Sequence, residues 1–356
     1  RTYARKYCTI GTYAPIDQAT SQCKSKELSP WLSECPSQIL RNSAVNWYQT
    51  YQKFMSGKCG RPKRKPKTDK GSIYLTREVF RFDHCDDGNV RLFIGTKTNN
   101  IGYLSFKAHG KFEIPNSLYV RKERGHYYVS FCYEQGQPDR KLSTNEEHLA
   151  FLQGATREYL EEHTMGVDRG VAIPVCAGEQ TYDFTHSQKK NMSKADRYIK
   201  RLQRKLARQQ KGSNRRAKTK HRIAVHHAKK ANIRNDFAHK TSRLLVDSSA
   251  KIIVFEALRT ARMTRRPKAK QDEQGRFISN KAKQKAGLNK SILNVGWHVI
   301  ETYTYYKAYS SSKAVFKIPA PTTSQECAKC GHTHPDNRKT QALFVCGNCG
   351  NTDNAD

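Results

Sequence analysis

Four cysteines near the C-terminal end of the sequence carry its most specific chemical signal. Cys327 and Cys330 form one CxxC pair, Cys346 and Cys349 form a second, and 15 residues separate the two pairs. Four thiolates at this spacing suit a tetrahedral zinc ion, with each pair forming a short knuckle. Because four thiolates leave no open coordination position, we predict a structural zinc site rather than a catalytic one.

The residues beside the cysteine pairs fit the same interpretation. Gly331 and Gly350 directly follow the two pairs, where the backbone must turn tightly. His332 and His334 could replace a thiolate in principle. Since four cysteines already complete the shell, we interpret both histidines as loop residues. A zinc ribbon by itself does not define a function.

Three carboxylates from distant parts of the sequence form the second chemical signal. Asp168 and Glu256 each border an apolar strand, and Asp356 closes the sequence. A carboxylate beside a buried strand costs free energy unless it is paired or holds a cation. Taken singly, each acid is more simply explained as a salt-bridged or surface residue. Taken together, the three can hold two divalent cations, the arrangement used for phosphodiester hydrolysis.

Magnesium is the cation that such a set of ligands favours. Mg²⁺ prefers oxygen ligands and keeps several of its waters, which leaves room for a phosphate group. In a two-metal site, one ion activates the attacking water and the other stabilises the leaving 3′ oxygen. We therefore predict that Asp168, Glu256 and Asp356 hold Mg²⁺ and are catalytic.

Strands and helices must position these acids. Residues 189–243 hold 20 Lys and Arg against two Asp, and Gly212-Ser213-Asn214 divides them into a basic helical hairpin. Residues 259–290 are polar and are predicted to be mobile, and residues 292–309 are predicted to form a helix. Strands are predicted as a pair within Met165–Ala177, with Val171–Cys176 as its second member, and at Lys251–Phe255 and Ala314–Ile318.

The first part of the sequence has a different pattern. Residues 1–12 are predicted to be extended, and apolar residues from Leu40 to Phe54 recur at helical spacing, with Ser37 as a plausible N-cap. A basic loop follows at 58–70. Between residues 72 and 133, short Tyr, Phe, Val and Ile runs separated by turns predict a small antiparallel barrel or sheet.

The net charge of the chain indicates which kind of molecule it binds. The chain has 356 residues, with 65 Lys and Arg against 31 Asp and Glu, giving a formal charge of +34. Such a charge repels itself unless a polyanion neutralises it, so nucleic acid is the expected partner. A cationic membrane-binding protein is the alternative, but the sequence lacks a long basic helix with a bulky apolar face. No apolar run is long enough for a transmembrane helix, and no signal peptide follows Arg1.

The number and spacing of the cysteines indicate in which cellular compartment the protein functions. Seven of the 11 cysteines are scattered singly, and the other four form the quartet. An odd total with one cluster is typical of an intracellular metal-binding protein rather than a secreted disulfide protein. We therefore expect a cytoplasmic protein of bacterial or archaeal type, associated with the nucleoid when it is bound to DNA.

Three motifs resemble one family. Gly-Val-Asp-Arg-Gly at 166–170, Val-Phe-Glu-Ala-Leu at 254–258 and the stretch Ser324–Asp356 resemble the three RuvC motifs and the zinc ribbon of TnpB. TnpB proteins are transposon-encoded, RNA-guided DNA endonucleases related to compact type V CRISPR effectors. Weaker similarity runs through Trp31–Phe54 and Val295-Gly296-Trp297. The resemblance covers nearly the whole chain and is strongest after residue 160.

The resemblance implies a multidomain α+β fold. A β-barrel wedge domain would contain a helical recognition insertion, and an RNase H-like (RuvC) α/β nuclease domain would carry the four-cysteine zinc ribbon. The expected boundaries are 1–15 for the first part of the wedge, 16–70 for the helical insertion and basic loop, 71–140 for the rest of the wedge, 141–162 for a linker, and 163–356 for the nuclease domain with its ribbon at 321–350.

The resemblance also implies partners and site residues. A guide RNA would pair with one strand of double-stranded target DNA, and the protein would read a short motif beside the target. By match of motif, Asp168, Glu256 and Asp356 would be the catalytic acids. A monomer with RNA is favoured. Backbone contacts would come from the basic loop and hairpin, at Lys63, Arg64, Lys65, Arg201, Arg204, Lys205, Arg208, Arg215 and Arg216.

The sequence departs from the family pattern at two places, and other functions stay open. The family continues past the third acid, whereas this sequence stops at Asp356, and Ala257 and Leu258 follow Glu256 where an acidic residue or Asn is common. One alternative is a compact type V CRISPR effector, which would differ in its guide RNA. Others are a guided DNA-binding regulator without cleavage, which would be expected to lack an acid, and a zinc-ribbon transposase that acts on DNA alone.

Overall fold

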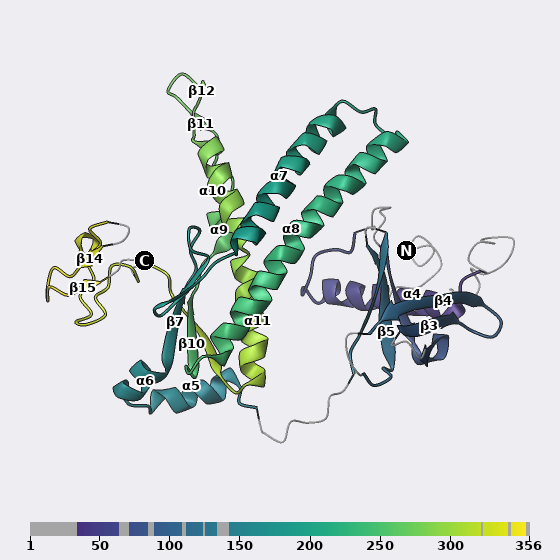
Figure 1. Cartoon of the computed structure of the whole chain (residues 1–356), viewed down its shortest axis with the longest axis horizontal. Helices are drawn as coiled ribbons and strands as arrows, with labels where there is room; N and C mark the ends of the chain where they lie inside the picture. Colours follow the sequence, from purple (N-terminus) through teal and green to yellow (C-terminus); the bar gives the residue numbers. More distant parts are fainter. Residues whose placement is uncertain are drawn as a thin grey trace. The chain divides into compact units, whose positions relative to one another are not determined.

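The computed structural model divides the chain into two compact units, Arg1–Gln137 and Pro138–Asp356 (Figure 1). It describes residues 34–63, 71–84, 89–108, 112–123, 125–133, 142–321, 323–340 and 343–353. The extended segment predicted at 1–12 lies outside these residues.

Helix α4 (Ser37–Met55) occupies the place where the sequence predicts an amphipathic helix. The predicted cap is off by one residue, because Pro36 holds the N-cap position and Ser37 is the first helical residue. The carbonyl of Pro36 accepts a hydrogen bond from the Ile39 N–H at 3.1 Å. Proline suits this position because its φ is fixed and the position requires no backbone N–H.

Two antiparallel sheets make up the rest of the described first unit. The strand orders are β1-β5-β6 and β2-β3-β4. Leu75, Leu92 and Leu118 are almost fully buried, and Phe82 packs edge-on against Phe131 with ring centroids 5.9 Å apart. The two sheets share this core. Their strands are β1 (Gly71–Thr76), β2 (Phe80–His84), β3 (Asn89–Gly95), β4 (Asn100–Lys107), β5 (Ser117–Glu123) and β6 (His126–Phe131), with a 3-10 turn at Arg77–Val79.

A five-stranded sheet forms the centre of the second unit, in the order β13-β10-β7-β8-β9. The three strands β7, β10 and β13 are parallel, whereas β8 and β9 continue antiparallel from β7. The predicted strands at Lys251–Phe255 and Ala314–Ile318 are present, but β8 begins at Val175, four residues later than the predicted second strand of the pair. The bounds are β7 (Thr164–Asp168), β8 (Val175–Ala177), β9 (Gln180–Tyr182), β10 (Ile252–Glu256) and β13 (Ala314–Ile318).

The predicted basic hairpin is formed by α7 (His186–Ala207) and α8 (Asn214–Asp247). Helix α7 begins with a capping box, in which Thr185 accepts from the Gln188 N–H and the Gln188 side chain accepts from the Thr185 N–H. The Ser213 side chain caps α8 in the same way, by accepting from the Arg216 N–H. The predicted break at Gly212-Ser213-Asn214 therefore lies where α8 begins.

The region after β10 differs from the prediction. Instead of a mobile segment at 259–290, the chain forms α9 (Thr260–Met263), a hairpin of β11 (Lys270–Gln271) and β12 (Phe277–Ile278), and α10 (Ala282–Val295). The single helix predicted at 292–309 is also two helices, because Gly296 has φ of +81° and separates α10 from α11 (Trp297–Ser310). Glycine takes this left-handed conformation at little cost.

Residues 141–162, expected to be a linker, belong to the second unit and hold two short helices. These are α5 (Asn145–Gln153) and α6 (Arg157–His163). Thr144 forms a capping box with Glu147 at the start of α5. The Asn145 side chain donates a hydrogen bond to the Val315 carbonyl of β13 at 3.0 Å, which fixes α5 to the edge of the sheet.

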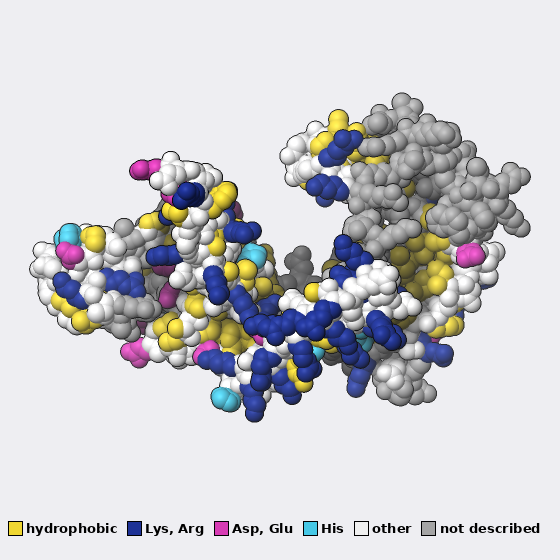
Figure 2. Space-filling model, turned by 90° about the horizontal axis from the view of Figure 1, so that it is seen from above, with side chains coloured by type: hydrophobic (Ala, Val, Ile, Leu, Met, Phe, Trp, Pro, Cys, Tyr) yellow, Lys and Arg dark blue, Asp and Glu magenta, His cyan; other side chains and the backbone are white. Residues whose placement is uncertain are grey.

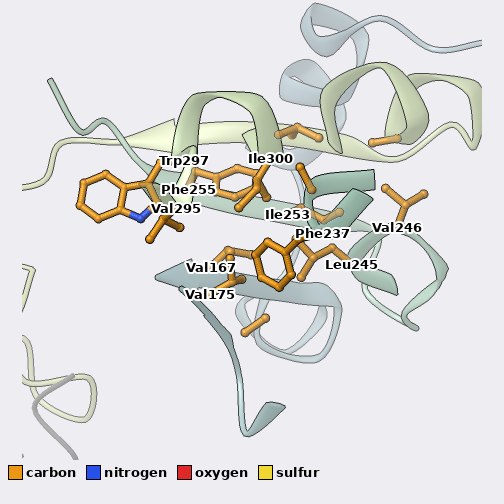
Figure 3. Close-up of a cluster of buried hydrophobic side chains, with 14 of the residues drawn as sticks. Val167, Val175, Phe237, Leu245, Val246, Ile253, Phe255, Val295, Trp297 and Ile300 are labelled. Carbon is orange, nitrogen blue, oxygen red and sulfur yellow. The ribbon is translucent and has the colours of Figure 1, made fainter. Parts of the chain in front are cut away.

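Apolar residues from the sheet and from α8, α10 and α11 form the core of the second unit (Figure 3). Ile253 and Phe255 of β10 are fully buried, as is Ile300 of α11. Phe237 of α8 lies beside Val167 of β7 in the same cluster. This packing makes a rigid base for the residues at the ends of β7 and β10. No helix in the described residues is long and apolar enough to cross a membrane.

Candidate nuclease site and zinc ribbon

Asp168 and Glu256 lie at the carboxyl ends of two neighbouring parallel strands. The register of β7 and β10 pairs Val167 with Phe255, so the two acids are the next residues along their strands. After β7 the sheet continues on one side through β8, and after β10 it continues on the other side through β13. Ligands in open α/β sheets bind at such a switch point, outside the carboxyl ends of the strands.

Both acids line one pocket of about 470 Å³. Its other walls come from Leu258 and from the segment after β13, including the ribbon: Ala320, Thr323, Ser324, Glu326, Ala328, Arg338, Phe344, Asn351 and Asp353. Asp353 ends β15 (Thr352–Asp353), which pairs with β14 (Phe344–Val345). Asp356, the predicted third acid, lies outside the described residues, three positions after Asp353.

Neither carboxylate is neutralised by a Lys or Arg side chain of the described residues. Asp168 is exposed, and its Oδ1 accepts a hydrogen bond from the Arg169 backbone N–H at 2.7 Å. Glu256 is half-buried, and its Oε1 accepts from the Thr323 hydroxyl at 2.6 Å. Each carboxylate therefore keeps oxygen lone pairs that are free to bind a cation.

The oxygen chemistry of this pocket fits Mg²⁺. Carboxylates without cationic partners are the hard ligands that Mg²⁺ prefers, and the pocket is large enough to admit waters and a phosphate. Within the described ranges, the cysteine quartet is the only group of at least three His, Cys, Asp or Glu whose ligand atoms all lie within 4.8 Å of one another. The two described acids would thus need Asp356 or another ligand to complete the site.

A buried arginine connects the ends of the parallel strands. The Arg169 side chain is 2% exposed and lies over the Phe255 ring at 5.1 Å. Its guanidinium donates to the Glu256 backbone carbonyl and, at 2.8 Å, to Glu301 of α11. Glu301 also pairs with Lys317 of β13. This network ties together the chain segments that carry both acids.

The charge of Glu301 is maintained by this network. Burial alone would raise the pKa of the Glu301 carboxyl, but hydrogen bonds and charges from Lys317 and Arg169 outweigh burial and lower the pKa. Sequence reasoning missed Arg169 as a structural residue, since a single Arg beside an acid in a motif has no distinctive local pattern. Its partner Glu301 lies 132 positions away.

Gly170 and Trp297 complete the turn after Asp168. A Cβ on Gly170 would lie 2.6 Å from the Ile173 carbonyl oxygen, so any side chain would force the backbone to move. The same Gly170 carbonyl accepts a hydrogen bond from the Trp297 indole N–H at 3.0 Å. Trp297 is buried and begins α11, which places this helix against the site.

The four predicted zinc ligands come together in the ribbon. Cys327 and Cys349 have sulfur atoms 3.6 Å apart, as do Cys330 and Cys346. Gly331 and Gly350, the residues after the pairs, have φ of +72° and +67°. Their N–H groups donate to the carbonyls of Cys327 and Cys346, closing the two predicted knuckles. The quartet is compatible with zinc.

The four thiols do not ionise equally. A backbone hydrogen bond from His332 is the largest influence on Cys330 and lowers its pKa to about 6. A backbone hydrogen bond from Asn351 would lower the pKa of Cys349, but its sulfur neighbours, Cys330 first, raise that pKa to about 12. Four thiolates this close repel one another, so they can all be ionised only with a cation such as Zn²⁺ between them.

Asn337 holds the two knuckles together. Its side chain is 1% exposed, and its amide donates to the carbonyls of Gln325 and His332 at 2.9 and 3.0 Å. Its Oδ1 accepts from the Gly347 N–H at 2.9 Å. The sequence contains no signal for this role, because an isolated Asn in a loop has many possible functions. His332 and His334 stack on each other outside the quartet, as loop residues.

The residues predicted to bind nucleic acid have different environments. Lys63, Arg201, Arg204, Lys205, Arg208 and Arg215 are exposed, whereas Arg64 and Lys65 lie outside the described residues. Arg216 is half-buried, and its guanidinium donates to the carbonyls of Leu206 and Gln209 at the end of α7. Figure 2 shows Lys and Arg side chains in a band along the hairpin, with few acids among them. Arg216 thus has a structural contact that the prediction did not include.

Two families match parts of the chain. The family described as "Probable transposase", OrfB_IS605, matches residues 130–266, and the Cas12f1-like TNB domain matches residues 297–356. The first match includes Asp168 and Glu256, and the second includes the cysteine quartet.

Comparisons with individual proteins agree with these families. "Putative RNA-guided DNA endonuclease InsQ" of Escherichia coli (strain K12) is 28% identical over 97% of this chain and 78% of its own length. "CRISPR-associated endodeoxyribonuclease Cas12f1" of Sulfoacidibacillus thermotolerans is 27% identical over 69% of this chain, which spans about half (52%) of that relative.

A solved structure has a similar fold. The structure described as a Cas12f1-sgRNA-target DNA complex aligns with a TM-score of 0.55 and 11% identity, over 98% of this chain and 75% of that chain. At this identity the similarity concerns the fold alone, a mixed α+β architecture. The two family matches and the two relatives bear out the resemblance of the sequence motifs to TnpB proteins.

Proposed function

We propose that this protein is a transposon-associated, RNA-guided DNA endonuclease. The observation that carries the proposal is that Asp168 and Glu256 lie at the ends of adjacent parallel strands, line one pocket and form no ion pair with a cation of the described residues. The E. coli relative carries the name "Putative RNA-guided DNA endonuclease InsQ", and the formal charge of +34 suits polyanionic partners.

The proposed chemistry is metal-dependent phosphodiester hydrolysis. Bound Mg²⁺ would supply Lewis-acid stabilisation of the phosphate and a more acidic water. The chain's own contribution is to hold the ligands in place: Arg169 fixes the backbone at the end of β10, and Thr323 orients the Glu256 carboxylate. Asp356 is the proposed third ligand, as the motif resemblance implies.

The domains follow the same proposal. The two antiparallel sheets of the first unit would be the wedge domain, with α4 in the helical recognition insertion. The second unit would be the RuvC-like nuclease domain with its four-cysteine ribbon, where zinc would be structural. Guide RNA and double-stranded target DNA are the proposed partners, and the neighbour of similar fold was solved with sgRNA and target DNA.

Sequencing the RNA that copurifies with the protein tests the proposal most directly. We expect one abundant RNA with a constant scaffold and a segment that can pair with DNA. A DNA duplex carrying the paired sequence beside a randomised flank should then be cut in Mg²⁺, and the cut products should reveal the adjacent motif. Cutting that is independent of the RNA sequence would contradict the proposal.

A compact type V CRISPR effector is the second candidate. The match of residues 297–356 to the Cas12f1-like TNB domain favours it, as does the Cas12f1 relative. The copurifying RNA separates the candidates: a scaffold derived from a transposon end supports the first, and CRISPR repeat sequence supports the second.

A further inference from the structure

A wide groove lies between the helical hairpin and α10. It has a volume of about 1510 Å³, and its walls come from α7, α8, α10 and the segment after α9. In Figure 1, α7 and α10 extend as neighbouring arms on one side of the sheet. All of these elements belong to the second unit. The groove is a separate site from the acidic pocket, and the two share no lining residue.

Positive charge dominates the groove. Asp196 is the only acid among its lining residues. Such a concentration of cations is unfavourable unless a polyanion neutralises it. The seven Lys and Arg residues of the lining are Arg197, Lys200, Lys230, Arg234, Arg266, Lys283 and Lys290.

Asp196 neutralises two of these cations within the protein. Its Oδ1 accepts from the Lys230 ammonium at 2.6 Å, and its Oδ2 pairs with Lys290 at 2.9 Å. Lys230 is only 6% exposed and also donates to Asn294. These contacts tie α7 to α8 and α10, so the charges of Lys230 and Lys290 stabilise the groove itself.

Of the five other lining cations, Arg234 is half-buried, and the remaining four form no contact of this kind. All four are exposed, and none forms an ion pair with an acid of the described segments. We call them the groove cations: Arg197 and Lys200 on α7, Arg266 after α9, and Lys283 on α10. They lie on different elements around the groove, so an anion between the elements could contact several of them.

The groove has few aromatic side chains on which bases could stack, and His227 is the only aromatic ring of its lining. Its lining contains no Phe, Tyr or Trp. Single-strand binding sites that hold bases use aromatic side chains for stacking, whereas contacts from Lys and Arg to phosphates are independent of sequence. The chemistry of the groove therefore matches the sugar–phosphate backbone rather than the bases.

We propose that this groove binds the phosphodiester backbone of one nucleic-acid strand through the groove cations. The inference rests on the proposed function and deepens it by assigning a backbone contact to a surface outside the acidic pocket. Guide RNA and DNA share this chemistry, so the experiment has one arm for each.

The test compares two double variants that remove equal charge. Arg197→Ala with Lys283→Ala removes one groove cation from α7 and one from α10. The matched control is Lys240→Ala with Arg243→Ala, exposed residues of α8 that each pair with an acid four positions away. Affinity is measured without Mg²⁺ at several salt concentrations, for RNA extracted from the wild-type protein and for single-stranded oligo(dT) DNA. Thermal melting checks that both variants fold.

We expect the groove variant to lose affinity and to reduce the log–log salt slope by about 0.7 for each lost contact, or about 1.4 in total. A reduction with RNA alone assigns the groove to the guide, and one with DNA alone assigns it to a DNA strand. A slope equal to that of the control variant with both probes overturns the inference. If wild-type protein binds neither probe and carries no RNA, the proposed function fails as well, so the two failures are distinguishable.

Discussion

The acidic pocket and the basic groove of the second unit use carboxylates in opposite ways. In the groove, Asp196 is held by Lys230 and Lys290, and its charge serves to join three helices. In the pocket, the described part of the chain gives Asp168 a hydrogen bond from a backbone N–H and Glu256 one from a hydroxyl, and pairs neither acid with a cation. A carboxylate that is paired with cations stabilises the fold, whereas one left without a cation retains its affinity for metal.

The difference separates the acids that we propose to bind metal from the acid that is held in ion pairs. Asp168 and Glu256 border apolar strands, whereas Asp196 lies in the basic segment 189–243. Of these three acids, only Asp196 forms an ion pair with a cation of the described residues. Asp196 has a pKa that is lowered by its two lysines in spite of the opposing effect of burial, as expected for a structural ion pair. The predictions that follow test this separation between structural and functional acids.

Replacing Asp168 or Glu256 with Ala should have the largest effect. Loss of a metal ligand should reduce guided cleavage at least about a thousandfold, equivalent to about 4 kcal/mol of transition-state stabilisation. Binding of guide RNA and target should persist, because basic residues elsewhere supply most of the affinity. Cleavage assays in Mg²⁺, with target binding measured in parallel, test this.

Two control variants distinguish the acids of the pocket from acids elsewhere in the second unit. Asp196→Asn should lower stability while cleavage by the folded fraction persists, because this acid is paired in the groove. Glu158→Gln, on the exposed surface of α6, should change neither quantity. Retained Mg²⁺-dependent cutting by the Asp168 or Glu256 variant would contradict the assignment of these acids.

Removing a zinc ligand should have the next largest effect. Cys327→Ser should reduce zinc content from one ion per chain to near zero, because three thiolates bind zinc far less tightly than four. The loosened ribbon should also impair cleavage, since Thr323, Glu326 and Asp353 line the acidic pocket. Metal analysis of purified protein measures the first effect.

Cys176→Ser is the matched control, because Cys176 lies outside the quartet. Its zinc content and cleavage should equal those of wild type. An active wild-type protein that contains no zinc would refute the structural zinc assignment.

The sequence predicted most strands of the central sheet and that the four cysteines come together, but it did not predict the contacts that fix these residues. Local patterns mark these residues in the sequence: apolar runs precede Asp168 and Glu256, and the CxxC spacing marks the cysteines. Arg169 and Thr323 act through partners 132 and 67 positions away, which no local pattern reveals. These contacts exist only once the sheet has formed.

The prediction for residues 259–290 was wrong for the same physical reason. Their polar composition gave no helical signal, yet α10 is fixed by tertiary contacts. Asn289 donates to the Thr264 carbonyl at 2.7 Å, and Lys290 pairs with Asp196. Such contacts override weak local propensity. Residues that line the basic groove therefore could not be grouped from the sequence.

Removing the contacts of Arg169 with Glu301 and with the Glu256 carbonyl should lower the free energy of unfolding. Arg169→Met leaves Glu301 buried beside Lys317 alone and removes the bond to the Glu256 carbonyl, so unfolding should become easier by about 3 to 5 kcal/mol. Arg169→Lys keeps the charge but cannot donate to both acceptors with the planar geometry of a guanidinium. Its free energy of unfolding should therefore lie between those of the wild type and of Arg169→Met. Chemical denaturation measures both variants.

The pH dependence distinguishes a charge effect from a packing effect. The pKa of Glu301 is lowered in the folded state, so the stability that it contributes is present above the unfolded pKa and is lost as pH falls through the folded pKa. The destabilisation caused by Glu301→Gln at pH 7 should therefore shrink below about pH 5. A penalty that is constant down to pH 3 would assign the effect to packing alone.

The smallest predicted effect concerns Thr323, which donates a hydrogen bond to the Glu256 carboxylate at 2.6 Å. Thr323→Val keeps the shape of the side chain and removes the donor, so Glu256 should lose its fixed orientation. A hydrogen bond to a charged group contributes about 1.5 to 3 kcal/mol, and we expect cleavage to slow by about tenfold. Because the metal ligands themselves remain, a higher Mg²⁺ concentration should restore part of the rate. Thr323→Ser retains the hydroxyl and should remain close to wild type. Equal loss in the Val and Ser variants would show that the methyl group, rather than the hydrogen bond to Glu256, is what the site requires.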